Sequence, residues 1–286
     1  MTAFRIAVLM TCHNRRDITL SCLDALFKQV LPLDTTFKVY LVDDGSTDGT
    51  GDAVIQRYPS VNVIKGNGNL YWCGGMRMAW TEAMKEHYDY YLWLNDDTIL
   101  YENAISTLIW VNQVIKDQGL KEGIVVGSVM DPDTGQFAYG GKIQIKKNSL
   151  SSKNVIPTNS VQECDLFNGN LVLIPHLVAC TIGNLSKDYT HAIGDTDYGL
   201  RARKYGIPIR IAPKYLGKCR TNPRSTWTDP QTPLIKRIRH LYSPKGLPPR
   251  EWYIFTKQHF GSAWLLFLIK LHLRAIFPKL WIIMGK

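Results

Sequence analysis

The sequence predicts an α/β fold built on a mainly parallel sheet, and three observations support this prediction. Short apolar runs alternate with amphipathic segments along the N-terminal third, as in strand–helix–strand units. Polar clusters follow these apolar runs where the strands would end, which is where ligands bind in such sheets. The 286 residues, 45% hydrophobic and 20% charged, have an ordinary globular composition, which excludes collagen, coiled coils and wholly disordered chains.

The expected elements follow in order from the N-terminus. Residues 6–11 form a branched apolar run typical of a buried strand, and Leu20, Leu23 and Leu26 give the next segment the apolar face of a helix. Residues 131–163 are rich in turn formers and predict loops or hairpins. We expect further strands at residues 37–42, 61–64, 90–94, 123–129 and 171–174, and helices at about 50–57, 76–86 and 193–205.

Charge divides the chain into two unlike parts. Residues 1–200 hold 16 Lys and Arg against 22 Asp and Glu, a net charge of −6, whereas residues 201–286 hold 18 against 2, a net charge of +16. Such a basic tail predicts an anionic partner: a membrane surface, a nucleic acid or phosphates. We therefore expect a catalytic domain over residues 1–225 and a basic helical extension over residues 226–286.

The C-terminal helix predicted over residues 264–278 is basic and amphipathic. Lys270 and Arg274 share one face beside a broad apolar surface, which favours docking on an anionic membrane surface. The uncharged run at residues 260–269 is too short to span a bilayer. The alternative is a helix packed on the domain or on a second copy. We expect no nucleic-acid partner, because no recognition motif accompanies the charge.

The six cysteines are scattered, without a C-x-x-C or a zinc-site spacing, so we expect reduced thiols. The first residues lead into a strand-like run without the pattern of a signal peptide. These features predict a cytoplasmic protein, peripheral on the inner face of the plasma membrane.

Two acidic pairs are candidates for chemistry. Asp96 and Asp97 directly follow the apolar run YYLWL, where carboxylates can hold a divalent cation against a substrate's phosphates. Asp195 and Asp197 open a helical segment, where a carboxylate can serve as a general base. For both pairs the alternative is that the carboxylates cap the start of a helix and take no part in chemistry.

Segments that contain glycine provide further candidate binding residues and exclude some common types of ligand-binding loop. Trp72 precedes Gly74 and Gly75, so the indole can stack on a base or sugar while the glycines allow close approach, or the tryptophan is simply buried beside a turn. The G-N-G at residues 66–68 lacks the third glycine of a dinucleotide loop, and no Gly-Lys-Ser/Thr loop exists. A calcium loop starting at Asp44 is also excluded, because its twelfth position is not glutamate.

The order of these motifs resembles a known family. TCHNR at residues 11–15, VDDGSTDGT at 42–50, NDD at 95–97 and GDTDYGLR at 194–201 follow one another along the chain. In this order they resemble the family 2 glycosyltransferases, inverting enzymes with the GT-A fold, over about residues 4–220. Rhamnosyltransferase-like members that build bacterial surface polysaccharides are included in the resemblance.

The resemblance implies a role for each matching residue. Asp195 matches the catalytic base, and Asp97 the ligand of Mg²⁺ or Mn²⁺ on the donor diphosphate, with Asp96 beside it. Asp44 would accept the N3–H of a uracil or thymine ring, with Asp43 nearby. The other positions implied in donor binding are Thr11, Asn14, Arg15, Asn69, Trp72 and Gly75.

Two departures from the family pattern concern the metal. Asn95 stands where many members have a third aspartate, and residues 215–220 lack the histidine that many members use as a metal ligand. Lys218 or Arg220 would then be candidates for stabilising the leaving diphosphate.

The implied function is transfer of a sugar from a UDP- or dTDP-sugar to a lipid-linked or growing oligosaccharide acceptor, as in O-antigen or capsule synthesis. One alternative is a membrane-bound scaffold that binds sugar nucleotides without transferring them. Another is a nucleotidyltransferase, which would need a glycine-rich basic loop after the first strand that residues 11–15 do not provide.

Overall fold

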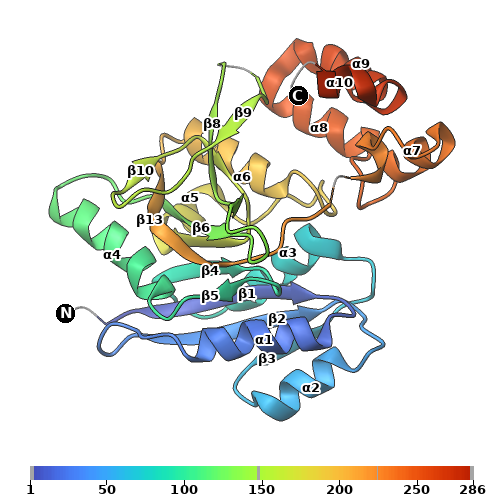
Figure 1. The fold of residues 1–286 in the computed structure, drawn as a ribbon. Coiled ribbons are helices and arrows are strands. Elements are labelled where there is room, and N and C mark those ends of the chain that lie inside the picture. The colour runs from blue at the N-terminus through green and yellow to red at the C-terminus, as the bar shows by residue number, and fades with distance from the viewer. Residues whose placement is uncertain (1–2, 147–148, 224, 284–286) are drawn as a thin grey trace.

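One mixed sheet of ten strands forms the centre of the protein in a computed structural model, which describes residues 3–146, 149–223 and 225–283 (Figure 1). The strands lie in the order β10–β13–β6–β12–β4–β1–β2–β3, with β5 paired to β13 and β7 paired to β6. Their bounds are β1 Arg5–Cys12, β2 Thr36–Asp43, β3 Asn62–Lys65, β4 Tyr90–Leu94, β5 Ile99–Leu100, β6 Ile124–Met130, β7 Phe137–Tyr139, β10 Gln162–Glu163, β12 Leu171–Pro175 and β13 Ile209–Lys218.

The N-terminal half of this sheet is parallel, which confirms the predicted α/β class. Strand β1 pairs in parallel with β2 and with β4, and β2 pairs in parallel with β3. The register places Cys12 opposite Asp43, and the Asp44 N–H donates to the Cys12 carbonyl at 2.9 Å. The loops that follow β1 and β2 therefore meet at one edge, as the sequence pattern indicated.

The other half of the sheet is mixed. Strand β12 lies between β4 and β6 and is antiparallel to both, whereas β13 is parallel to β6. A small second sheet contains β11 Leu166–Phe167, β8 Gly141–Gln144 and β9 Ser152–Asn154. The strand expected at 171–174 and the hairpins expected within 131–163 are present, and the antiparallel direction of β12 is a feature that the apolar run did not reveal.

Helices cover both faces of the large sheet. Helices α1, α2 and α4 pack on one face and α3, α5 and α6 on the other. Alternate residues of β1 serve the two layers: Val8 belongs to the first apolar core, and Leu9 to the second. The bounds are α1 Arg16–Phe27, α2 Thr50–Arg57, α3 Tyr71–Ala83, α4 Ala104–Asp117, α5 His176–Ile182 and α6 Gly194–Lys204.

Helix α3 starts five residues earlier than the sequence indicated, at Tyr71 rather than at residue 76. Two glycines in a row favour a loop over a helix, but tertiary contacts override that preference here. The Asp44 carboxylate accepts the N–H groups of Leu70 and Tyr71 at 2.9 Å each, so it anchors the start of the helix. Trp72 and Gly75 consequently lie within the first turns of α3.

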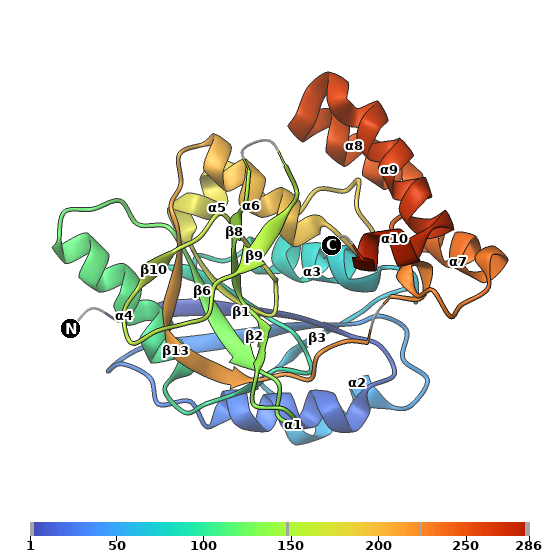
Figure 2. The ribbon, with the colours of Figure 1, turned by 45° about the horizontal axis from the view of Figure 1, so that its top comes forward.

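The chain ends in a group of helices on one side of the molecule, beyond α3 and α6 (Figure 2). The predicted helix at 264–278 is present as α9, which ends at Ile276, and Pro278 opens a further short helix. Trp227, Leu241, Leu271 and Ala275 form a separate apolar core there. The bounds are η1 Thr226–Thr228, α7 Leu234–Leu241, α8 Pro249–Phe260, η2 Gly261–Ala263, α9 Trp264–Ile276 and α10 Pro278–Ile283.

Two expectations about this extension have different outcomes. Within the part of the chain that the structure describes, no helix has both the length and the apolar character needed to cross a membrane. The domain boundary placed after residue 225 stays a prediction.

Candidate active site

A cavity of about 320 Å³ opens at the carboxyl ends of β1, β2 and β4. This is the position that the strand-end polar clusters predicted. Six of the predicted site residues line it: Thr11, Arg15, Asp44, Trp72, Asp96 and Asp97.

Asp44 is buried in the wall of this cavity, and only 4% of its surface is exposed. One carboxylate oxygen accepts the Gly68 N–H at 2.8 Å, and the other accepts the N–H groups of Leu70 and Tyr71. A carboxylate offers about four acceptor positions, so three bonds leave room for roughly one more donor. Asp44 thus organises the loop before α3 and retains acceptor capacity on the cavity side.

Arg15 joins the two carboxylates that follow β4. Its Nη1 lies 3.2 Å from Asp96 Oδ1, and its Nη2 donates to Asp97 Oδ2 at 2.8 Å. The guanidinium belongs to the loop between β1 and α1, so this contact connects the ends of β1 and β4. A cation and two carboxylates therefore share the wall of the cavity.

Burial dominates the electrostatics of Asp96. It raises the pKa of Asp96 to about 7, and the positive charge of Arg15 opposes this rise while the negative charge of Asp97 adds to it. The Thr19 hydroxyl in α1 also donates to Asp96 at 3.4 Å. Asp96 is 4% exposed, whereas the Asp97 side chain is 21% exposed and more open to the cavity.

Asp97 supplies the kind of donor atom that Mg²⁺ or Mn²⁺ prefers. Mg²⁺ in particular is commonly bound by one or two carboxylates together with substrate phosphates. No group of three or more His, Cys, Asp or Glu side chains arranged for a metal is found among the described residues. A divalent cation would therefore fit if Asp97 and oxygen atoms of a bound diphosphate held it together. The Asp97 carboxylate would then serve both the cation and Arg15.

Cys219 occupies the segment that lacks the expected histidine. Its thiol donates to Asp97 Oδ1 at 3.4 Å. Burial, followed by the charge of Asp97, raises the pKa of Cys219 to about 12. The thiol is neutral at ordinary pH, so it orients Asp97 by a weak hydrogen bond rather than adding a charge.

Asn95 and Trp72 form a direct contact beside the carboxylates. The Trp72 indole Nε1 donates to Asn95 Oδ1 at 2.7 Å, and the ring meets Trp93 edge to face. The amide at the position where many relatives have a third aspartate thus holds the tryptophan in the cavity wall. Trp72 packs on Trp93 and also lines the cavity, and its stacking on a donor base or sugar stays a prediction.

Gly75 allows a close helix–strand contact. A Cβ atom there would lie 2.1 Å from Thr11 Oγ1, so only glycine lets α3 approach β1 at this distance. Gly75 is buried, and its place is behind the cavity wall that Thr11 helps to form. Gly75 therefore fixes the position of Thr11, and a role of Gly75 in donor binding stays a prediction.

Besides Gly75 and Asp195, three predicted residues lie outside the residues that line the cavity. The Asn14 side chain accepts the Thr47 N–H at 2.7 Å and ties the loop after β1 to the loop after β2. Asp43 accepts the Ser46 N–H at 3.1 Å and packs against the start of α2. Asn69 is exposed in the loop before α3. Direct contact of these three with a donor stays a prediction.

Asp195 lies in the first turn of α6. Its Oδ1 accepts the N–H of Thr196 at 2.6 Å, and its Oδ2 accepts the Gly169 N–H at 3.2 Å. The preceding Gly194 packs against Cys73 and Trp72 of α3, so α6 begins next to the cavity wall. The carboxylate is half-buried and is held at both oxygens by backbone donors.

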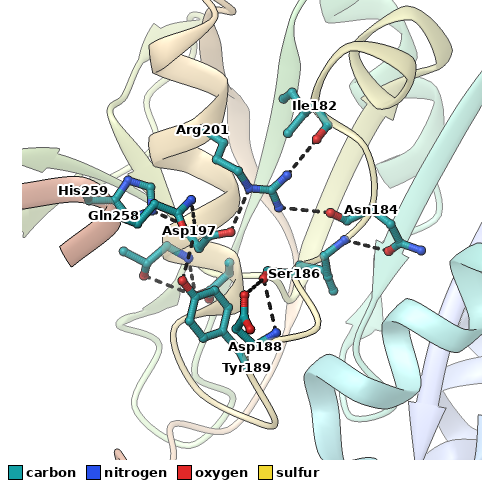
Figure 3. A network of polar contacts seen from close by, with 12 residues as sticks. Ile182, Asn184, Ser186, Asp188, Tyr189, Asp197, Arg201, Gln258 and His259 are labelled. Atoms are coloured by element: carbon teal, nitrogen blue, oxygen red, sulfur yellow. Dashed lines mark hydrogen bonds and ion pairs between the residues drawn. The ribbon is translucent and has the colours of Figure 1, made fainter. Parts of the chain in front are cut away.

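A buried network holds the same turn from behind (Figure 3). The Asp197 side chain is fully buried, and its Oδ2 accepts Arg201 Nε at 2.8 Å. Its Oδ1 accepts His259 Nε2 at 2.8 Å and the Tyr189 hydroxyl at 3.4 Å. Because His259 belongs to α8, the C-terminal extension contributes directly to the support of the α6 turn that carries Asp195.

The extension also contributes to the cavity itself. Lys245 of the extension lines it together with His191 from the segment before α6, and neither was singled out as a site residue from the sequence. Burial lowers the pKa of His191, the Lys245 charge lowers it further, and the Asp195 charge opposes this. Lys245 stands in a proline-punctuated basic segment without a motif, so only its charge was a signal.

Lys218 and Arg220, the cations suggested from the sequence for a leaving diphosphate, are not among the residues that line the cavity. Lys218 Nζ is 5.9 Å from the centre of the Tyr101 ring, and Arg220 pairs with Asp133 at 3.1 Å. Lys245 and Arg15 are the cations that line the cavity.

Comparisons with known proteins agree with this geometry. The family model described as Glycosyl transferase family 2 matches residues 7–163. The solved structure of Mannosyltransferase PcManGT from Pyrobaculum calidifontis, in complex with GDP-Man and Mn²⁺, is similar with a TM-score of 0.58 and 14% sequence identity. That match covers 100% of this chain and 89% of the other, and it confirms the GT-A type of fold. No curated protein sequence matches the chain.

Proposed function

Because the chain belongs to glycosyl transferase family 2, we propose that this glycosyltransferase moves a sugar, with inversion, from a UDP- or dTDP-sugar to a lipid-linked or growing glycan acceptor of a surface polysaccharide. The observation that supports it best is the cavity where Asp44, Asp97 and Arg15 meet beside the α6 turn that carries Asp195. It combines acceptor groups for a base, a ligand for a cation on phosphates, and a candidate proton acceptor.

Donor recognition begins at Asp44. Its remaining acceptor capacity suits one N–H donor, such as N3–H of a uracil or thymine ring. Arg15 and Lys245 supply positive charge for the diphosphate, since guanidinium and ammonium groups form strong charge-assisted hydrogen bonds with phosphate oxygens. The donor would thus span from the loop before α3 to the strand end at Asp97.

A divalent cation would be held by Asp97. When bound, it would offset negative charge on the donor's phosphate oxygens. Mn²⁺ accompanies GDP-Man in the similar mannosyltransferase structure, which supports Mg²⁺ or Mn²⁺ here.

Asp195 would act as the general base. Its carboxylate would accept the proton of the acceptor hydroxyl while that oxygen attacks the anomeric carbon on the face opposite the nucleoside diphosphate. The bond from the anomeric carbon to the diphosphate oxygen breaks in the same displacement, so the anomeric configuration inverts. Gly169 and Thr196 hold the carboxylate in place, and Arg15 and Lys245 stabilise the leaving group.

The C-terminal helices would dock on an anionic membrane surface. Exposed large apolar side chains recur over residues 265–283, among them Leu266, Phe277 and Ile283 at 60%, 51% and 81%. Lys270 and Lys279 are exposed on the same helices. Apolar side chains flanked by cations fit the boundary between headgroups and acyl chains, where a lipid-linked acceptor is presented.

Donor binding is tested by thermal unfolding with UDP-, dTDP- and GDP-sugars, each with Mn²⁺ and with a chelator. The GDP-sugars are included because the similar structure holds GDP-Man. A donor at a hundred times its Kd should raise the unfolding temperature by roughly 4–5 °C, and the Asp97→Asn variant should lose the metal-dependent part. If no nucleotide sugar shifts the wild-type protein, the proposal fails. Transfer with retained anomeric configuration would contradict the displacement.

A further inference from the structure

We infer that a second cavity, between α7, α9 and α10, binds the phosphate of an anionic lipid headgroup. This cavity of about 290 Å³ lies within the C-terminal extension and is separate in its lining from the candidate active site. Its walls include Pro230, Arg237, Ile276, Phe277, Lys279 and Leu280.

Arg237 gives the cavity a buried cation with unused hydrogen-bonding capacity. The residue is 8% exposed although it carries a guanidinium group. Its Nη2 donates to the Ile276 carbonyl at 3.2 Å, while its Nε has no hydrogen-bond partner within the described part of the chain. A buried charged donor without a partner is costly, so such an atom indicates a missing acceptor.

Within the described residues, little negative charge is placed to meet this guanidinium. The described lining contains no carboxylate. Over residues 226–286 the acidic side chains are Asp229 and Glu251. The Asp229 carboxylate accepts hydrogen bonds from the neighbouring Gln231 and Thr232, and Glu251 accepts the Thr190 hydroxyl at 2.7 Å. An external anion is therefore the acceptor that fits.

The surroundings of the cavity favour a lipid over a free anion. Lys279 adds a second cation to the wall, and two cations suit a phosphate oxyanion. Phe277 and Leu280, which also line the cavity, are 51% and 52% exposed. A phospholipid can place its phosphate between Arg237 and Lys279 while its acyl chains cover these apolar groups. Inorganic phosphate would leave them in water.

This inference rests on the membrane docking proposed above and makes it specific. A diffuse basic surface would respond equally to the loss of any cation, at about 1 kcal/mol each, or roughly fivefold in affinity. A defined site loses more membrane affinity when one of its own donors is removed. A hydrogen bond to a charged group contributes roughly 1.5–3 kcal/mol, which is about tenfold and upward in affinity.

The test is co-sedimentation of the full chain with vesicles of phosphatidylcholine and phosphatidylglycerol in equal amounts, with pure phosphatidylcholine as background. Arg237→Gln and Lys279→Gln should each weaken binding about tenfold or more. The matched controls are Arg239→Gln on α7 and Lys270→Gln on α9, which remove the same charge from exposed positions outside the lining and should cost about fivefold or less. Because Lys279 is exposed, its variant tests the site even if Arg237→Gln fails to fold.

A competition experiment distinguishes the two sources of phosphate. Short-chain phosphatidylglycerol below its micellar concentration should displace the protein from vesicles, and inorganic phosphate at the same concentration should not. Equal competition by inorganic phosphate would overturn the lipid assignment, and equal losses in site and control variants would overturn the site. If the wild-type protein binds neither vesicle, the membrane docking fails as well, whereas donor binding and sugar transfer to a soluble acceptor would be unaffected.

Discussion

Replacing Asp197 by asparagine tests whether the buried network behind α6 supports the turn that carries Asp195. The substitution keeps the size of the side chain and removes its charge. Asp197 is fully buried, and Arg201, which is 15% exposed at its side chain, then loses its carboxylate partner. His259 and Tyr189 lose a charged acceptor at the same time.

The expected loss of stability follows from these contacts. Breaking one side of a buried ion pair costs about 3–5 kcal/mol. The lower end applies here, because Arg201 keeps its bonds to the carbonyls of Ile182 and Asn184 and the asparagine amide can still accept one bond. About 3 kcal/mol corresponds to a fall of roughly 5 °C in unfolding temperature, because the entropy of unfolding is about 2.1 cal/mol/K for each of the 286 residues.

Calorimetry measures the unfolding temperatures of Asp197→Asn and of the control variant Asp188→Asn. Asp188 is an exposed carboxylate of the preceding loop, so its variant should unfold within about 0.5 kcal/mol of the wild type. The Asp197 variant should also lose turnover at temperatures where it remains folded, with little change in donor affinity, since the network contacts α6 rather than the cavity. Equal stability of the two variants would show that the buried carboxylate of Asp197 does not stabilise the α6 turn.

Three further predictions follow from individual contacts. Gly75→Ala should destabilise the protein by about 1–3 kcal/mol, because its Cβ would collide with Thr11, whereas Gly199→Ala, with no neighbour closer than 3.5 Å, should be tolerated; chemical denaturation measures both. Lys245→Ala should weaken donor binding about tenfold or more by calorimetric titration, while Lys218→Ala, outside the cavity lining, should not. The raised pKa of Asp96, about 7 in the folded state and about 4 unfolded, means that the folded protein binds more protons between these pH values. Without metal, the free energy of unfolding of the wild type minus that of Asp96→Asn should therefore fall as pH rises from 4 to 7, by up to roughly 1 kcal/mol per pH unit. A difference that does not change with pH in denaturation experiments would contradict this.

Much of the site could be predicted because it depends on strand ends. The apolar runs at β1, β2 and β4 located the strands, and the parallel arrangement brought Arg15, Asp44 and Asp97 together at one edge. Such reasoning needs only the period of hydrophobic residues and the rule that parallel strands end together.

Other features depend on contacts between segments that are distant in sequence. The start of α3 is set by the Asp44 carboxylate, which local propensity at Gly74 and Gly75 could not indicate. The approach of His259 to Asp197, 62 residues apart, and the place of Lys245 in the cavity depend on how the extension packs. The basic composition of that extension predicted an anionic partner but not which cations face the cavity.

The proposed role of Asp195 as the base of a glycosyl transfer is tested most directly by the transfer rate of Asp195→Asn. Asparagine keeps the size of the side chain, and its one amide oxygen can still accept the N–H of Thr196 or of Gly169, but the amide cannot take up the acceptor proton. The measurement is single-turnover transfer from the donor identified by thermal shift, with equal donor affinity in wild type and variant as the condition. We predict a rate lower by about 10²–10⁴. A folded, donor-bound variant that transfers within a few-fold of the wild-type rate would contradict the account.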